Sequence, residues 1–263
     1  MELGLKDKIA LVAAASQGLG KACALALAQE GAKLVICSRR KKEITETAEE
    51  IERSTGSRVV PVEADMSKQQ DITRFVDVAK REFGTVHVLV NNAGGPPTGN
   101  IFEMPDAEWE KGFNLTMMSA VRLTRAVLPM MASQRWGRII TITSYVAKQP
   151  INELILSASF RPGIHALTKI LSNLHAKDNV TVNAVCPGNI LTKRQEDLSR
   201  SRAEQQKMGF EEYLRDAARQ IPAERLGRPD EIGGVVAFLA SEKASYINGV
   251  SMLVDGGITK GIN

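Results

Sequence analysis

Short apolar runs alternate along this chain with longer segments in which apolar residues recur at helical spacing. The runs are apolar at nearly every position, which is typical of parallel strands covered by helices on both faces. The expected strands are residues 8–13, 33–37, 58–62, 86–90, 138–143, 180–186 and 251–254. The expected helices are residues 21–29, 43–53, 72–83, 106–114, 115–134, 164–175 and 229–240.

This alternation predicts an α/β fold, with a Rossmann-like, doubly wound parallel sheet in three layers joined by right-handed crossovers. No linker or low-complexity stretch divides the chain, so residues 1–263 are expected to form a single domain. Residues 193–220 depart from the pattern because they are charged and weakly periodic. We expect this segment to be a substrate lid, the alternative being a surface excursion without function.

Charge and composition exclude several classes of protein. The net charge is +4, but charges of both signs alternate along the expected helices, so no nucleic-acid partner is expected. No apolar run of about 18 residues occurs, and no membrane span is predicted. The three cysteines are far apart and not closely spaced with histidine, so no metal site is predicted. The N-terminus lacks a charged, apolar leader, which fits a cytoplasmic protein.

A turn rich in small residues joins the first strand to the first helix. Small side chains here let the backbone approach a pyrophosphate, which rests at the helix N-terminus. Glycines in such a turn also occur where a strand simply turns into a helix, but the position in a first βα unit favours a dinucleotide. The candidate cofactor-binding residues of this turn are Ala14, Ser16, Gln17, Gly18 and Leu19.

Several motifs then follow in a fixed order. They are Gly18 with Gly20, Asn91-Asn92-Ala93-Gly94, Asn114 within Gly112–Leu115, Ser144 after a β-branched strand, Pro187-Gly188-Asn189-Ile190-Leu191-Thr192 and Val254-Asp255-Gly256-Gly257. In this order they resemble the short-chain dehydrogenase/reductase family, in particular its 3-oxoacyl-acyl-carrier-protein reductases. Ala13 and Ala14 depart from the pattern, since the family has Thr and Gly there.

The resemblance implies roles for the matched residues and an assembly. Asn92, Ala93 and Gly94 would pack on the adenosine side of the cofactor, and Asp65 and Met66 would lie at the adenine. The residues implied at the nicotinamide end are Pro187, Gly188, Ile190 and Thr192. Helices 115–134 and 164–175 resemble those that pair subunits in the family, which implies a homotetramer or homodimer.

The end of the second expected strand predicts which dinucleotide binds. An NAD site has a carboxylate there for the ribose 2′-hydroxyl, whereas this chain has Ser38, Arg39 and Arg40. An arginine fork matches the geometry of a 2′-phosphate. The alternative is a basic helix start, but cations are unfavourable at a helix N-terminus unless an anion is present. We therefore expect NADP(H).

The catalytic residues of the resembled family are altered in this chain. In the family a Ser polarises the carbonyl, a Tyr donates the proton, a Lys four residues on holds the ribose and lowers the Tyr pKa, and an Asn supports a water relay. Counting 13 and 17 residues from Ser144 leads to Ser157 and Arg161, and Asn114 matches the Asn. A serine is a much weaker acid than a tyrosine, and an arginine does not give up its proton. Tyr145 and Lys148 are weaker candidates for the acid.

These residues predict an NADPH-dependent oxidoreductase that reduces a small-molecule carbonyl with an altered catalytic acid. A 3-oxoacyl thioester is the substrate class that the resemblance implies. Two alternatives stay open: an NADPH-binding sensor or pseudoenzyme with little catalysis, and a dehydratase or isomerase on the same scaffold.

Overall fold

The sheet has seven strands, all parallel, in the computed structural model, which describes residues 2–262. The strands are β1 Ile9–Val12, β2 Lys33–Ser38, β3 Val59–Glu63, β4 Val88–Asn91, β5 Gly137–Ile142, β6 Val180–Pro187 and β7 Ser251–Val254. Their order across the sheet is β3-β2-β1-β4-β5-β6-β7. The order reverses between β1 and β4, and open α/β sheets bind ligands at such a point, beyond the carboxyl ends of the strands. The predicted doubly wound α/β fold is confirmed.

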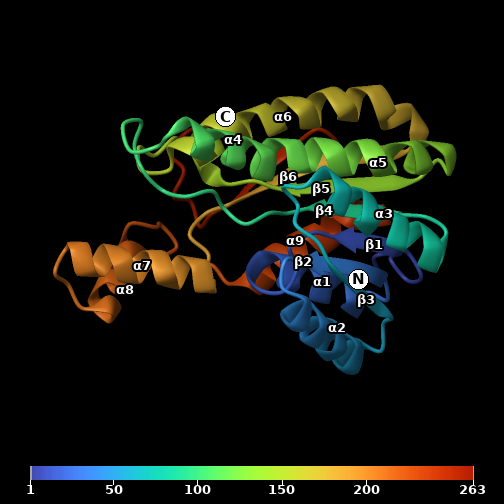
Figure 1. The fold of residues 1–263 in the computed structure, drawn as a ribbon, viewed down its shortest axis with the longest axis horizontal. Helices are drawn as coiled ribbons and strands as arrows, with labels where there is room; N and C mark the ends of the chain where they lie inside the picture. The colour runs from blue at the N-terminus through green and yellow to red at the C-terminus, as the bar shows by residue number, and fades with distance from the viewer. Residues whose placement is uncertain (1, 263) are drawn as a thin grey trace.

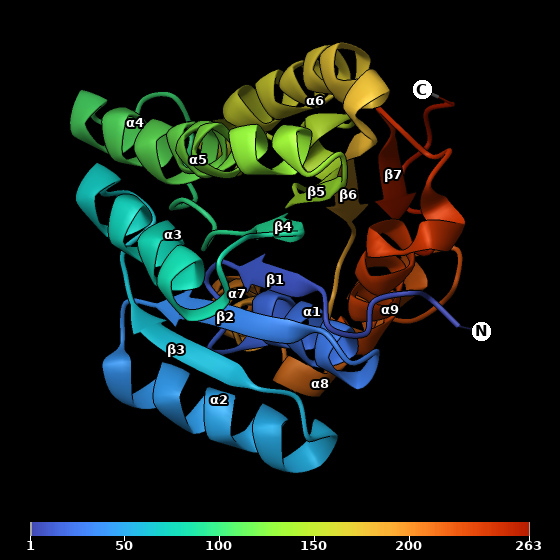
Figure 2. The same cartoon turned by 90° about the vertical axis from the view of Figure 1, so that its right-hand side faces the viewer.

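Helices cover both faces of this sheet (Figures 1 and 2). One face carries α1 Gly18–Gln29, α2 Lys41–Thr55 and α9 Pro229–Ala240. The other carries α3 Gln69–Phe83, α4 Asp106–Phe113, α5 Ser119–Ser133 and α6 Ile155–His175. The result is a three-layered domain, and α7 Lys193–Gln205 and α8 Phe210–Arg219 stand beside it (Figure 1).

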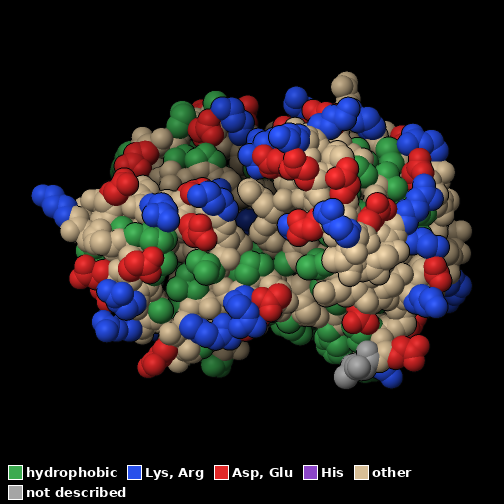
Figure 3. All heavy atoms as spheres, turned by 90° about the horizontal axis from the view of Figure 1, so that it is seen from below, with side chains coloured by type: hydrophobic (Ala, Val, Ile, Leu, Met, Phe, Trp, Pro, Cys, Tyr) green, Lys and Arg blue, Asp and Glu red, His purple; other side chains and the backbone are tan. Residues whose placement is uncertain are grey.

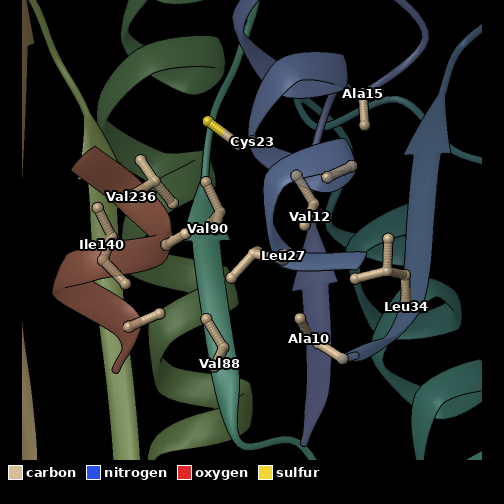
Figure 4. Close-up of a cluster of buried hydrophobic side chains, with 14 of the residues drawn as sticks. Ala10, Val12, Ala15, Cys23, Leu27, Leu34, Val88, Val90, Ile140 and Val236 are labelled. Atoms are coloured by element: carbon tan, nitrogen blue, oxygen red, sulfur yellow. The ribbon is translucent and has the colours of Figure 1, made fainter. Parts of the chain in front are cut away.

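The two faces of each central strand enter two separate cores. Ala10 and Val12 of β1 pack under α1 and α9, whereas Leu11 between them packs toward α3 and α5. Figure 4 shows the first core, where Leu27 of α1 and Val236 of α9 meet the side chains of the central strands. Burial on both faces explains why the strands read as continuous apolar runs rather than as alternating ones.

Three expected elements differ from the observed ones. Helix α6 begins at Ile155 rather than residue 164, and it contains Pro162 at an exposed position. The expected break after residue 114 is a π-helical turn, Asn114–Met118, through which the chain continues from α4 into α5. The segment 193–220, for which no helix was predicted, folds into α7 and α8.

Lysine, arginine, aspartate and glutamate side chains lie interspersed on the face seen in Figure 3. Among the described residues, no helix is both long and apolar enough to cross a membrane. Within the same part of the chain, no three His, Cys, Asp or Glu side chains come together as a metal site.

Candidate active site

The turn between β1 and α1 leaves a helix N-terminus open to an anion. The N-cap residue Gln17 makes no side-chain capping hydrogen bond, and the first turn of α1 holds no acidic residue. The first N–H groups of α1 therefore remain available to an anionic ligand, at the positive end of the helix dipole. Gly18 has φ +57°, and Ala14 reaches φ +49°, a left-handed conformation that costs a residue with a Cβ about 1–2 kcal/mol.

Asn92 holds this turn in place from the end of β4. Its Nδ2 donates hydrogen bonds to the carbonyl oxygens of Ala13 at 3.2 Å and Ala14 at 3.1 Å. A Cβ on Gly20 would collide with the Ala14 carbonyl and the Asn92 amide, so only glycine fits. The backbone is thus shaped as a cradle that a pyrophosphate fits, and the sequence motifs at residues 14–20 and 92–94 meet.

The predicted adenosine end lies beyond β2 and β3. Ser38 Oγ donates to the Arg40 carbonyl at 3.0 Å, and the Arg40 guanidinium pairs with Glu43 at 2.5 Å. Asp65 Oδ1 accepts from the backbone N–H and the hydroxyl of Ser67, at 2.9 and 2.8 Å. Burial acts to raise the pKa of the Asp65 carboxyl, but these hydrogen bonds and the charge of Arg39 outweigh it and hold the pKa below its ordinary value.

The charge of Arg39 thus acts on the Asp65 carboxyl, whereas Arg40 pairs with Glu43 of its own helix. Met66 is buried and its sulfur lies 3.9 Å from Cys37 Sγ, so it forms the floor of this end rather than its polar surface. Arg39 and Arg40 are both exposed, but only Arg40 pairs with a carboxylate among the described residues, so Arg39 is the arginine available to a phosphate.

The predicted nicotinamide end folds back over the phosphate turn. Thr192 caps α7 by accepting from the Gln195 N–H at 3.3 Å, and its Cγ2 lies 3.5 Å from where a Cβ on Gly18 would stand. A Cβ on Gly188 would meet the backbone of Asp255 at 2.7 Å, so β6 and the C-terminal loop touch there. Ile190 is buried against Gly227. Residues 18, 188 and 192 therefore lie at one edge of the sheet.

Ser157 and Arg161 lie one turn apart on α6 and touch each other. Arg161 Nε donates to Ser157 Oγ at 2.8 Å, and Arg161 Nη1 donates to the Ile142 carbonyl at 3.2 Å. Both side chains are buried, at 8% and 9% exposure. Burial first, and the charge of Arg194 second, lower the pKa of Arg161 to about 10, so the guanidinium stays charged at neutral pH.

A small cavity lies between Arg161 and the end of β4. Its walls include Asn92, Ala93, Thr141, Ile142 and Arg161. Arg161 therefore faces the end of β4, at the edge where the residues of the predicted dinucleotide site gather. Arg194, at the start of α7, was not predicted from the sequence, and its Nη2 donates to the Pro96 carbonyl at 2.8 Å. The signal that could have found it is its place two residues after Thr192.

Ser144 follows β5 and accepts from the Val146 N–H at 3.3 Å. Tyr145 beside it is buried, and burial raises the pKa of its phenol. A raised pKa makes Tyr145 a weaker acid than a free tyrosine, the opposite of what a proton donor requires.

A polar group that the sequence reasoning missed lies behind Ser144. The Thr143 hydroxyl is 3.0 Å from His165 Nε2 and 3.2 Å from Cys186 Sγ, and it lies 3.1 Å from the Val185 carbonyl. Burial first, then nearby positive charges, lower the pKa of His165 to about 4. The imidazole is therefore neutral at physiological pH. His165 stands four residues after Arg161, on the same face of α6.

Asn114 occupies the start of the π-helical turn. Its Nδ2 donates to the Glu110 carbonyl at 3.0 Å, and its Oδ1 accepts from Arg122 Nη2 at 3.2 Å. Within the described part of the chain, Asn114 forms no hydrogen bond with Ser144, Ser157 or Arg161. The structure thus brings Ser157 and Arg161 together, whereas Asn114 is held by its own helices.

Known proteins share this architecture and sequence. The family model described as enoyl-(acyl carrier protein) reductase matches residues 13–259. The 3-oxoacyl-[acyl-carrier-protein] reductase FabG of Escherichia coli is 34% identical, over 97% of this chain and 99% of that protein. Dehydrogenase/reductase SDR family member 4 of Caenorhabditis elegans is also 34% identical, over 96% and 95%.

A solved structure extends the similarity to the whole chain. L-sorbose reductase from Gluconobacter frateurii, in complex with NADPH and L-sorbose, superposes with a TM-score of 0.96 at 31% identity, covering 100% of both chains. The match of sequence over almost the full length, together with the same fold, establishes the relationship. The chain belongs to the short-chain dehydrogenase/reductase family of oxidoreductases.

Proposed function

We propose that this oxidoreductase reduces a carbonyl group at the expense of NADPH, with Ser157 and Arg161 in place of the family's tyrosine and lysine. NADP(H) as the cofactor is supported by the NADPH complexes of similar solved structures and by the absence of a carboxylate at the end of β2. The observation that carries the proposal is the 2.8 Å hydrogen bond from Arg161 Nε to Ser157 Oγ.

That hydrogen bond fixes what the serine can do. Because Ser157 Oγ accepts from a guanidinium, its own proton is left to donate to a substrate oxygen. The positive charge of Arg161 also stabilises negative charge that develops on that oxygen, in a site from which water is largely excluded. The bound cofactor supplies a hydride to the carbonyl carbon. The proton that completes the alcohol comes from water in this proposal, since serine is too weak an acid to release it at neutral pH.

The proposal predicts slow turnover that depends on Ser157. A missing general acid costs about 10²–10⁴-fold, so the protein should reduce ordinary ketones slowly. NADPH oxidation with a panel of carbonyl compounds is compared for the natural protein, Ser157→Ala and the exposed neighbour Ser159→Ala. We expect Ser157→Ala to lose activity and Ser159→Ala to keep it.

Restoring the family residues extends this test. Ser157→Tyr with Arg161→Lys should raise the rate more than either single change, because the lysine acts through the tyrosine that it tunes. If the natural protein is already fast and the double variant slower, another acid operates, and Tyr145→Phe is the next variant. Tight NADPH binding without turnover in all variants would instead favour a sensor or pseudoenzyme over a reductase.

The substrate class proposed from the similarity to FabG is a 3-oxoacyl thioester. A short thioester such as acetoacetyl-coenzyme A and a sugar ketone such as L-sorbose represent the two named relatives in the panel. Turnover of the thioester alone supports this class, and turnover of the sugar alone contradicts it.

Helices α7 and α8 form the proposed substrate lid. Two contacts hold α7 over the site: Arg194 donates to Pro96, and Arg202 pairs with Glu153 at 2.8 Å. The Glu153 side chain is 66% exposed at this contact, and exposed pairs contribute about 0–1 kcal/mol, so the lid is closed by few and weak interactions. A segment held in this way can open for substrate entry.

The proposed assembly is a homotetramer or a homodimer. On α6, Ile170 and Leu174 lie four residues apart and are 56% and 58% exposed, which leaves an apolar stripe suited to a second copy. Size-exclusion chromatography with light scattering measures the molar mass and therefore the number of subunits. We expect Ile170→Glu to yield a smaller species, and a monomeric natural protein would refute the proposal.

A cytoplasmic location is proposed for the protein. Its three cysteines are free and buried, which fits a reducing compartment. Cell fractionation with an antibody against the protein tests the location, and recovery with the membrane or the medium contradicts it.

A further inference from the structure

Arg161 carries a buried positive charge that the described residues do not neutralise. It is 9% exposed, and it donates hydrogen bonds to a serine hydroxyl and a backbone carbonyl. These two bonds use Nε and Nη1, whereas Nη2 donates to none of the other described residues. The residue lines the cavity beside Asn92 and Ala93. A buried cation is costly unless an anion pairs with it.

Arg194 brings a second guanidinium toward this cavity from the lid. The residue as a whole is exposed at the start of α7, but its side chain reaches inward: Nη2 bonds to the Pro96 carbonyl, and the guanidinium packs against Gly95. A Cβ on Gly95 would stand only 2.6 Å from Arg194 Nη2, so only glycine leaves room for it. Burial lowers the pKa of Arg194 as well.

The two guanidinium groups repel each other, and the carboxylates nearby pair elsewhere. Arg161 lines the cavity at Ala93, and the Arg194 guanidinium lies against Gly95 and Pro96 of the chain that follows, so the two cations flank one short stretch of chain. The charge of Arg194 also contributes to the lowered pKa of Arg161. Neither forms an ion pair with a described residue, whereas Glu153 pairs with Arg202 and Asp255 accepts from backbone N–H groups of its own loop. Two cations in this arrangement form a site for an anion.

We infer that Arg161 and Arg194 bind a carboxylate of the substrate, so that the protein acts on a carbonyl compound that carries an acid group. The inference rests on the proposed reductase function, and it names a substrate class that differs from the 3-oxoacyl thioester taken from the similarity to FabG. The phosphates of the cofactor have their own site at the open N-terminus of α1 and beside Arg39. The ribose that the family's lysine holds is uncharged, so the anion for the two cations comes from the substrate. A carboxylate beside the reacting carbonyl, as in a 2-oxo acid, suits this arrangement because Ser157 stands next to Arg161.

Binding measured without turnover tests this inference separately from the reductase function. Oxamate, the amide analogue of a 2-oxo acid, and its neutral counterpart oxamide are titrated calorimetrically into the protein saturated with NADPH. We expect oxamate to bind at least tenfold more tightly than oxamide, since charge-assisted hydrogen bonds from two arginines are lost with the neutral ligand. Absent carbonyl reduction with intact oxamate binding would refute the reductase proposal alone.

Two variants of α7 provide the matched comparison. Arg194→Gln should weaken the binding of oxamate by tenfold or more. Arg200→Gln should leave it unchanged, because the Arg200 guanidinium lies over the Phe210 ring, 3.9 Å from its centroid. Thermal unfolding of both variants verifies that they are folded. The inference is overturned if oxamate and oxamide bind with equal affinity or if oxamate does not bind. It is also overturned if Arg194→Gln binds oxamate as tightly as the natural protein does.

A last titration separates substrate from cofactor as the source of the anion. Oxamate and inorganic pyrophosphate are titrated into the protein without nucleotide. If NADPH abolishes oxamate binding and pyrophosphate competes with it, the arginines serve the cofactor phosphates and the inference is wrong. If oxamate binds in the presence of NADPH and pyrophosphate does not displace it, the inference is supported.

Discussion

The amide of Asn92 offers the sharpest test of how the phosphate turn is built. Asn92→Ala removes two hydrogen bonds, to the Ala13 and Ala14 carbonyls, and replaces them with no other donor. A hydrogen bond contributes about 1 kcal/mol net, so the free energy of unfolding should fall by about 2 kcal/mol. For a domain of this size each kcal/mol moves Tm by about 2–4 °C, which predicts a loss of roughly 4–8 °C.

Asn92→Ala should also weaken the binding of NADPH, although Asn92 acts on the cofactor through the turn that it holds. Ala14 is held at φ +49° against a cost of about 1–2 kcal/mol, and without Asn92 the turn relaxes unless the cofactor restores it. NADPH affinity should then drop by roughly tenfold, the factor that corresponds to 1.4 kcal/mol. Asn92→Asp should be worse than Asn92→Ala, because its carboxylate faces two carbonyl oxygens and an anionic ligand.

Calorimetric unfolding and NADPH titration of the two variants measure both effects. Adding Ala14→Gly to Asn92→Ala should recover part of the affinity, because glycine adopts a positive φ without strain. The reasoning is refuted if Asn92→Ala unfolds at the temperature of the natural protein and binds NADPH equally well.

Four further predictions concern single features of the chain. Arg39→Ala should weaken the binding of NADPH about tenfold or more and leave the binding of NADH unchanged. Equal affinity of the natural protein for the two cofactors contradicts this prediction. Ala14→Gly alone should raise Tm by about 2–4 °C, the effect of about 1 kcal/mol of relieved strain, as scanning calorimetry measures. Hydrogen exchange in residues 193–220 should slow in a ternary complex, and unchanged exchange argues against a lid. Below pH 6.5 His165 takes up a proton in the unfolded state but not in the folded state, where its pKa is about 4. The free energy of unfolding should therefore fall as the pH drops from 6.5 to 4. Measured by urea unfolding, it should depend less on pH in His165→Gln.

Elements with local signals could be predicted from the sequence. Gly84 ends α3 at φ +78°, as its position after an amphipathic run predicted. The start of α6 was missed because Pro162 indicates a helix boundary. In the structure Pro162 is exposed, so water can bond the carbonyl that loses its amide donor, and the helix continues through it. The caps Thr192 and Gly209 could have revealed α7 and α8.

The candidate site was predictable only where its partners are close in sequence. Ser157 and Arg161, four residues apart, meet as helical spacing requires. Arg194 touches Pro96 from 98 residues away, and no periodicity encodes such a contact. Arg40 was expected to be free for a phosphate, but Glu43 three residues on engages it, a pairing that the same spacing rule could have indicated.

The strand order has a consequence for how the chain reaches this fold during synthesis. β1 lies inside the sheet, β2 and β3 extend it on one side, and β4, β5, β6 and β7 then extend it on the other. Each strand after β1 therefore pairs with a strand that was synthesised earlier, and no strand must be inserted between two earlier ones. Assembly can proceed in the direction of translation, at about 5–20 residues per second, with one growing edge exposed after β3. The last strand, β7, covers β6 only after Ser251–Val254 has been made, so truncation before Ser251 should leave β6 as an open edge for aggregation.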